Sequence, residues 1–214
     1  MLVAGLVWAL LLGKGLSPSG IPALSGPVQP DGRVDAREWA GALDVQFEGL
    51  RVRLGTRGDV LAVAVELEGP GIATLLLGTR DRIWVLHASA ALGTGQYHCA
   101  GDGTCVRRRD LAYRCRDPGG SPAAERCRTE FRTTEGWVAN VAPQAGLARE
   151  FLVDRSHFGR PDQPLFLAVT GLVLPERPAR WPSGLDDASS VKLQQGFLGE
   201  RARFSVDTWF PVRP

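Results

Sequence analysis

Short runs of alternating apolar and polar residues, separated by glycine-containing turns, constrain the fold of this chain more than any other feature. The alternation covers residues 43–47 and 50–54, and a turn at residues 56–59 leads into a third run over residues 60–67. A period of two is typical of strands that bury one face. These runs predict an antiparallel hairpin near the start of a β-rich domain.

Further strand-like runs follow at residues 72–77, 83–87, 136–141, 148–153 and 165–174, and a last edge strand is predicted at residues 204–210. The sequence contains no heptad pattern and no internal repeat, and turn residues recur at short intervals. A chain of 214 residues is long enough for one sandwich with insertions. We therefore predict a single all-β domain, an antiparallel β-sandwich over residues 26–214.

The segment Asp31–Trp39 has a defined role at almost every position. It opens with an Asp-Gly pair that suits a tight turn. Asp35 is a candidate N-cap for a short helix, with Glu38 reaching back in a capping box. Val34 and Trp39 are spaced as a hydrophobic staple, so we expect Trp39 to be a core anchor.

This segment resembles the start of domains similar to family 9 carbohydrate-binding modules, also called DOMON-like domains. Two later blocks carry the same resemblance: residues 148–159, where an acidic residue precedes an apolar strand, and the tryptophan-containing loop at residues 180–184. The resemblance covers roughly residues 28–210 and is weak in the middle third. It implies an antiparallel β-sandwich of the kind usually found outside the cytoplasm. The alternative is an ordinary capped turn that anchors Trp39 in another fold.

Sugar recognition in the family uses a clamp of aromatic rings, supported by polar groups that bond the sugar hydroxyls. The resemblance places one ring at Trp181, but residues 72–78 lack the tryptophan and acid of the partner block, so Trp84 or Trp137 would have to substitute. Two exposed facing rings would favour a sugar site, whereas buried rings would favour a protein-interaction module. The ligand-binding residues implied by the resemblance are Arg180, Trp181, Asp186 and Asp187.

The four cysteines lie within one polar, arginine-rich window, at Cys99, Cys105, Cys115 and Cys127. An even count predicts two disulfides if the chain is exported, as its first residues indicate below, and the sequence leaves all three pairings open. A metal site that includes His98 is the alternative, but the cysteines lack the close C-x-x-C spacing of structural zinc sites. We predict that residues 89–130 form a long insertion, an irregular loop held by the disulfides.

The chain begins with an apolar run at residues 2–12, followed by a Ser/Pro/Gly-rich stretch through Pro30. This pattern resembles a secretory signal peptide over residues 1–25. Ala23-Leu24-Ser25 fits a cleavage site, and an earlier cut near Ser19 is the alternative. We therefore predict a secreted or periplasmic protein that has no membrane span after signal removal.

Metal, haem and catalytic chemistry have little support in the sequence. Some DOMON-like subunits bind b-type haem, but the only methionine is Met1, and we expect the three histidines, His87, His98 and His157, to be structural or solvated. Hydrolase and phosphate-binding motifs are missing. The paired acids, Glu66 with Glu68 and Asp186 with Asp187, are possible calcium or glycosidase groups, but adjacent acids usually face water. No cofactor is predicted.

The predicted function is therefore a non-catalytic exported binding module. Its ligand is either a glycan or, in the alternative, a protein of the cell envelope that docks on the sandwich edge and the arginine-rich cysteine region. Nucleic acid is not an expected partner, because the net charge is only +2 and no basic helix or aromatic-studded basic strand occurs.

Overall fold

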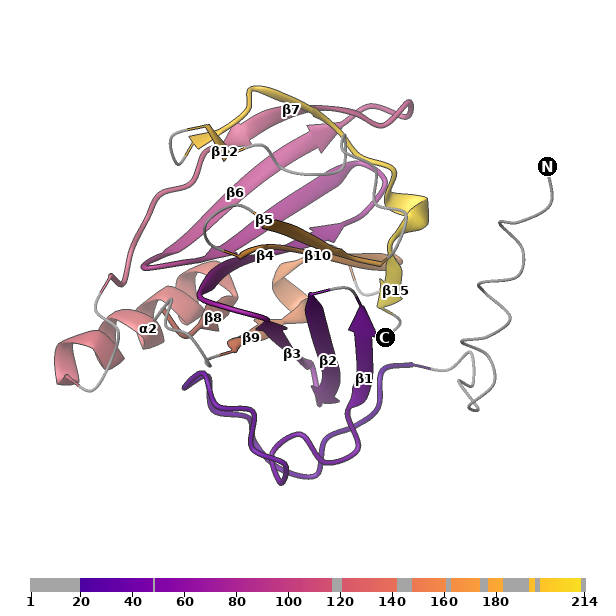
Figure 1. Ribbon diagram of the computed structural model, residues 1–214. Coiled ribbons are helices and arrows are strands. Elements are labelled where there is room, and N and C mark those ends of the chain that lie inside the picture. The colour runs from indigo at the N-terminus through magenta and orange to yellow at the C-terminus, as the bar shows by residue number, and fades with distance from the viewer. Residues whose placement is uncertain are drawn as a thin grey trace.

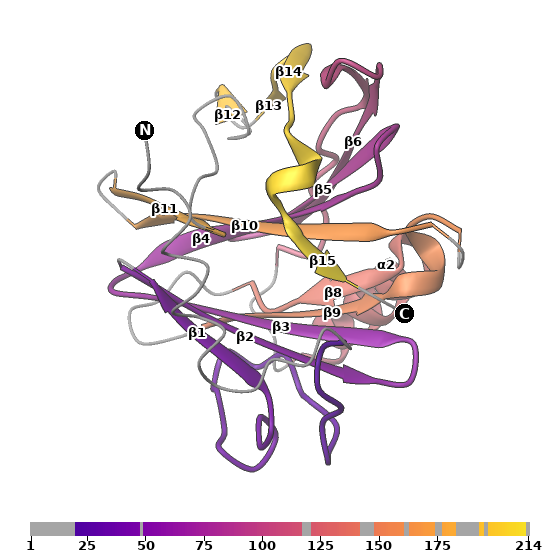
Figure 2. The same cartoon turned by 90° about the vertical axis from the view of Figure 1, so that its right-hand side faces the viewer.

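The computed structural model describes residues 20–47, 49–116, 121–141, 148–160, 163–173, 177–182, 193–194 and 197–212. Two antiparallel sheets face each other as the layers of a sandwich (Figure 2), which confirms the predicted all-β class. The smaller sheet has five strands in the order β1-β2-β3-β9-β8: β1 Leu43–Phe47, β2 Leu50–Arg57, β3 Val60–Leu67, β9 Arg149–Asp154 and β8 Trp137–Ala139.

The larger sheet has eight strands. Seven follow the order β11-β10-β4-β5-β6-β7-β14, and the eighth, β15, pairs with β10. Their bounds are β11 Arg177–Trp181, β10 Leu165–Val173, β4 Gly71–Gly78, β5 Arg82–Ala88, β6 Leu92–Cys99, β7 Thr104–Arg109, β14 Arg201–Arg203 and β15 Phe210–Val212. A separate two-stranded ribbon is formed by β12 Leu193–Gln194 and β13 Phe197–Leu198.

The main core lies between the two sheets. It forms because alternate residues of each strand point inward, such as Leu75 and Leu77 of β4, which are fully buried. Trp137 is also fully buried, stacks on Phe151 and donates its indole N–H to Thr94 Oγ1 at 2.8 Å. The polar atom of this tryptophan is therefore satisfied inside the apolar layer.

Each sheet also has a covered outer face. The N-terminal segment, residues 20–42, runs across the outside of the smaller sheet (Figure 1), where Leu24 and Trp39 pack on Ala62 and Ala64 of β3. The C-terminal region covers part of the outer face of the larger sheet, where Trp209 belongs to a second apolar cluster. Strands buried on both faces explain why β4 and β5 read as nearly continuous apolar runs.

The expectation of an irregular loop over residues 89–130 was wrong. Strands β6 and β7 form a hairpin within it, and helix α2 spans Pro122–Glu135. The strand pattern of β6 is hidden in the sequence because Gly93 and Gly95 have no side chains to alternate. Glycine is needed at these positions because side chains of later segments pack directly over them. Ser121 caps the start of the helix, where its hydroxyl accepts from the Ala124 N–H at 3.1 Å, and Gly136 caps the end.

The two predicted disulfides are confirmed, and the structure fixes their pairing. Cys99 and Cys105 lie directly opposite each other in the β6–β7 hairpin, and the second bond joins Cys115 to Cys127 in α2. One bond therefore closes a hairpin and the other attaches a helix. Within the described parts of the chain, no helix is long and apolar enough to cross a membrane.

Two local expectations need correction. Residues 204–210 do not form one edge strand, because a short 3-10 turn at Val206–Thr208 separates β14 from β15. The predicted capped helix before Trp39 is a single turn. Asp35 caps it by accepting the Arg37 N–H at 2.7 Å, but the Asp35 N–H already bonds the Arg33 carbonyl. A capping box with Glu38 is therefore absent.

Candidate functional site

The aromatic residues proposed for a sugar clamp are buried. Trp181 lies in strand β11, is 6% exposed and packs against Phe210 with 5.1 Å between ring centroids. Trp84 is 7% exposed and Trp137 is fully buried. No two tryptophans of the described residues present exposed facing rings, and buried rings favour a protein-interaction module over a sugar site. Arg180 is partly buried in the same strand as Trp181, and Asp186 and Asp187 lie outside the described residues.

The acidic residue Glu66 is engaged in a charge network on the smaller sheet. Its carboxylate forms an ion pair with Arg53 at 2.7 Å, and Arg53 also reaches Asp44. Hydrogen bonds from Arg51 lower the pKa of Asp44, with a further contribution from Arg53. Because arginines neutralise these acids, the network is a stabilising surface ladder between neighbouring strands.

The three histidines occupy different environments and do not converge. His87 is 2% exposed, and its Nδ1 lies 2.9 Å from the Thr74 hydroxyl. Burial lowers the pKa of His87 to about 4, so its ring is neutral at physiological pH. His98 is exposed on β6, and His157 is exposed in a 3-10 turn. The described residues contain no group of three or more His, Cys, Asp or Glu side chains placed to hold a metal ion.

A buried carboxylate anchors the N-terminal segment. Glu150 of β9 is fully buried and accepts the Trp39 indole N–H at 3.0 Å and the Gly32 N–H at 2.8 Å. Its own N–H bonds the side chain of Asn140 at 2.8 Å. Burial raises the pKa of Glu150 to about 7, although the two bonds from Trp39 and Gly32 oppose the change. Trp39 itself is 5% exposed, which confirms that it is a core anchor.

The end of the larger sheet that contains β6, β7 and β14 extends away from the smaller sheet (Figure 2). Strand register places a basic surface at this end. Arg82 of β5 lies opposite His98 of β6, His98 lies opposite Val106 of β7, and Val106 lies opposite Arg201 of β14. Residues directly opposite in neighbouring strands present their side chains on the same face. Arg203 belongs to this face because it follows Arg201 by two positions. We call these five residues the basic face.

The basic face is accessible, and among the described residues no ion pair offsets its positive charge. His98, Arg201 and Arg203 are exposed, and Val106 is 37% exposed at its centre. Other arginines of the described chain form ion pairs, for example Arg132 with Asp154 at 2.6 Å, but none is formed by Arg82, Arg201 or Arg203 with any described residue.

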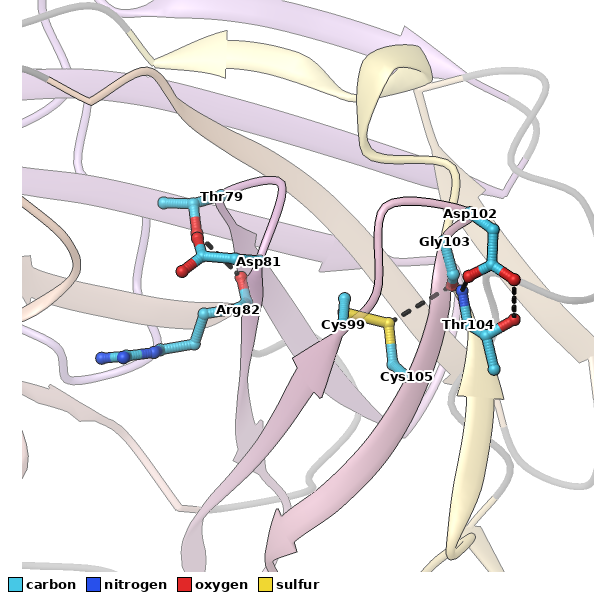
Figure 3. The surroundings of a disulfide bond; sticks show 8 residues. All are labelled: Thr79, Asp81, Arg82, Cys99, Asp102, Gly103, Thr104 and Cys105. Carbon is cyan, nitrogen blue, oxygen red and sulfur yellow. Dashed lines mark hydrogen bonds between the residues drawn. A yellow bond between two sulfur atoms is a disulfide. The ribbon is translucent and has the colours of Figure 1, made fainter.

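Turns and a disulfide hold this face in place (Figure 3). The bond between Cys99 and Cys105 joins the two central strands, and the Cys99 N–H bonds the Asp81 carbonyl at 2.9 Å, which links the hairpin to the turn before β5. Asp81 accepts the Thr79 hydroxyl at 2.6 Å. That bond lowers the pKa of Asp81, and the charges of Arg82 and His98 lower it further. This carboxylate is therefore ionised and committed to the turn at the border of the face.

Asp102 likewise stabilises the turn at the tip of the hairpin, where it accepts the Thr104 N–H at 2.9 Å (Figure 3).

The position of Arg82 is also restrained by an aromatic ring, because its cation lies over the Trp84 ring, 5.6 Å from the ring centroid. The basic side chains thus project from a cross-linked sheet, and their positions are set by strand register. The sequence pattern indicates the cysteine region and its arginines, but it does not predict the alignment of residues 82, 98, 106 and 201, because that register depends on pairings between distant strands.

Fold and site together define a disulfide-bonded β-sandwich with a basic face at one end of its larger sheet. Comparison of the chain with protein-family models, with curated proteins and with solved structures found no match.

Proposed function

We propose that this protein is a non-catalytic binding module that acts outside the cytoplasm and that its basic face binds an acidic segment of a protein partner. The observation that carries this proposal is the register of Arg82, His98, Val106 and Arg201 across four neighbouring strands. The DOMON-like resemblance of the sequence agrees with a binding role on a sandwich scaffold.

Charge and apolar contact together favour a protein partner. The guanidinium groups provide electrostatic attraction and hydrogen-bond donors for carboxylates. Val106 gives the centre of the face an apolar contact, as in the core of protein interfaces. Burial of Trp181 removes the main support for a sugar clamp, so a protein partner is favoured over a neutral glycan.

An oxidising compartment is supported by the two disulfides and by the signal-like N-terminal sequence. The cross-link between Cys99 and Cys105 also fits a binding role, because it restrains β6 and β7 at the centre of the basic face, and restrained strands lose less conformational entropy when a partner docks.

Charge reversal tests the proposal. A fluorescein-labelled peptide rich in glutamate is titrated with the parent and with Arg201→Glu/Arg203→Glu by anisotropy at low salt. The reversal should weaken binding by about tenfold or more, since two attractive contacts become repulsive. Arg33→Glu/Arg37→Glu is the matched control, because it makes the same change in net charge at exposed positions of the N-terminal segment.

The control variant should bind as the parent does, and added salt should weaken binding to both. Equal weakening by the two double variants would show that only net charge matters and would overturn the proposed face. Failure of the parent to bind any acidic peptide, or binding confined to acidic polysaccharides, would overturn the assignment of a protein partner.

A further inference from the structure

Strand β14 forms one edge of the larger sheet. It pairs with β7 on one side and has no strand on the other side in the described part of the chain. The pairing begins and ends with two hydrogen bonds: the Arg107 N–H donates to the Glu200 carbonyl at 2.9 Å, and the Phe204 N–H donates to the Gly103 carbonyl at 3.0 Å. These bonds fix which backbone groups face β7.

Hydrogen-bonded positions alternate along an antiparallel pair. Residues 200 and 204 bond toward β7, so Ala202 between them also faces β7 with its backbone. The N–H and C=O groups of Arg201 and Arg203 therefore point away from β7, toward the open edge. Backbone groups of this kind form a template for another strand.

The side chains of the same two residues complement this edge. Arg201 and Arg203 project from the basic face, and both are exposed. A strand that pairs with β14 would place every second side chain beside these guanidinium groups. A second copy of β14 is disfavoured there, because it would bring arginine against arginine. Carboxylates at alternate positions would meet both arginines while the backbone bonds form.

We propose that the acidic partner binds by adding an antiparallel strand to the open edge of β14, with Asp or Glu at every second position beside Arg201 and Arg203. This inference rests on the proposed function and specifies its mode: backbone bonds give affinity, and the alternating charges give register and specificity. The partner is thus an extended acidic segment with a period of two, and a folded acidic surface does not fit this mode.

The test uses the acetylated, amidated heptapeptide Thr-Glu-Thr-Glu-Thr-Glu-Thr. In an antiparallel pair the glutamates that face the arginines also donate their backbone N–H groups to β14, whereas the threonine N–H groups point away. A peptide N-methylated at the glutamates should therefore bind about tenfold more weakly than the parent peptide. A peptide N-methylated at the inner threonines should bind within about twofold of it, since its donors to β14 are intact.

A second peptide of equal charge, with its three glutamates contiguous, should bind more weakly than the alternating one. Equal affinities of the two N-methylated peptides, with binding of the unmodified peptide still sensitive to Arg201→Glu/Arg203→Glu, would overturn strand addition and leave the basic face as the binding site. Failure of all the peptides to bind would overturn the proposed function itself.

Discussion

The carboxylate of Glu150 shows how one buried residue can organise a whole segment. Both of its oxygens accept N–H groups from the N-terminal segment, and the residue is fully buried beneath Trp39. Removal of an ion from water costs more than two neutral hydrogen bonds return, so the pKa of Glu150 rises to about 7. The protonation state of this one group is therefore linked to the stability of the fold.

Between about pH 6.5 and pH 8 the free energy of unfolding should fall by about 1 kcal/mol because of Glu150. Its pKa is raised from 4.5 to about 7 in the folded chain, so its stabilising contribution is full below pH 4.5 and is lost as the pH rises through about 7. Chemical denaturation across this range measures the slope. Glu150→Gln should flatten it, and the exposed control Glu130→Gln should not.

Below about pH 6.5, His87 changes the stability with the opposite sign. Burial lowers its pKa from 6.5 to about 4, so its contribution is full above pH 6.5 and is lost as the pH falls toward 4. A slope above pH 6.5 that survives Glu150→Gln would show that another group is responsible.

Substitution of Trp39 should be among the most damaging single changes on the outside of the smaller sheet. Trp39→Ala should lower the free energy of unfolding by about 3 to 5 kcal/mol, because it leaves a cavity and removes a donor to Glu150. Phe47→Ala is the control, since Phe47 is 39% exposed and should cost less than about 1 kcal/mol. If the melting temperature of Trp39→Ala equalled that of the parent protein, the result would contradict the anchor role of Trp39.

At the level of single elements, local sequence patterns predicted those strands whose formation depends on local interactions. The runs at residues 43–47 and 60–67 appear as β1 and β3 with the same bounds. The alternation of β1 matches partly buried and exposed positions, whereas β3 is buried on both faces because the N-terminal segment covers Ala62 and Ala64. Helix α2 was missed although Ser121, Pro122 and Gly136 are ordinary cap signals, because the expectation of a loop outweighed them. Strand β6 was missed because Gly93 and Gly95 carry no side chain to alternate.

The candidate site was predicted less well, for a different physical reason. Local sequence identified the cysteines and the arginine-rich region, but Arg82 and Arg201 become neighbours of one surface only through pairings across β5, β6, β7 and β14. Trp181 was expected in a loop, yet its strand pairs with β10 and turns the ring into the core. Burial of a tryptophan depends on strand register, and register is not a local property.

The two disulfides should contribute unequally to stability. The bond between Cys115 and Cys127 spans 12 residues and the bond between Cys99 and Cys105 spans 6, so the first restricts the unfolded chain more. Paired alanine substitutions should cost about 3 kcal/mol for the longer loop and about 2 kcal/mol for the shorter one. Chemical denaturation of each double variant compares them, and a larger cost for the hairpin bond would contradict this order.

At the level of the whole molecule, burial is distributed unevenly across the larger sheet. The central strands β4 and β5 are buried on both faces, whereas β14 at the edge exposes two of its three residues. Stability against local opening follows the same order, because opening the edge strand exposes little apolar surface and breaks few backbone bonds. The proposed binding edge therefore opens more readily than the central strands of this sheet.

Hydrogen exchange should reveal this gradient. Amides of β4 and β5 should exchange only through global unfolding, and those of β14 should exchange orders of magnitude faster. Mass spectrometry of peptic fragments provides the measurement. Saturating amounts of an alternating acidic peptide should slow exchange at residues 201–203 and leave β4 unchanged. Protection of free β14 equal to that of β4 would contradict an open edge.

The contact between Leu24 and Gly55 limits where the N-terminal segment can be cleaved without loss of packing on the smaller sheet. Leu24 is 8% exposed, and a Cβ on Gly55 would lie 2.3 Å from its Cγ. The Leu24 N–H also donates to the Thr56 carbonyl at 2.8 Å, and the Thr56 N–H donates to Pro22 at 2.8 Å. Cleavage after Ser25 would remove this pairing. It would also expose Gly55, whose lack of a side chain leaves the space that Leu24 fills. A cleavage that keeps this pairing must leave Pro22 in the chain, because the Thr56 N–H bonds its carbonyl, and N-terminal sequencing of the purified protein can establish the first residue.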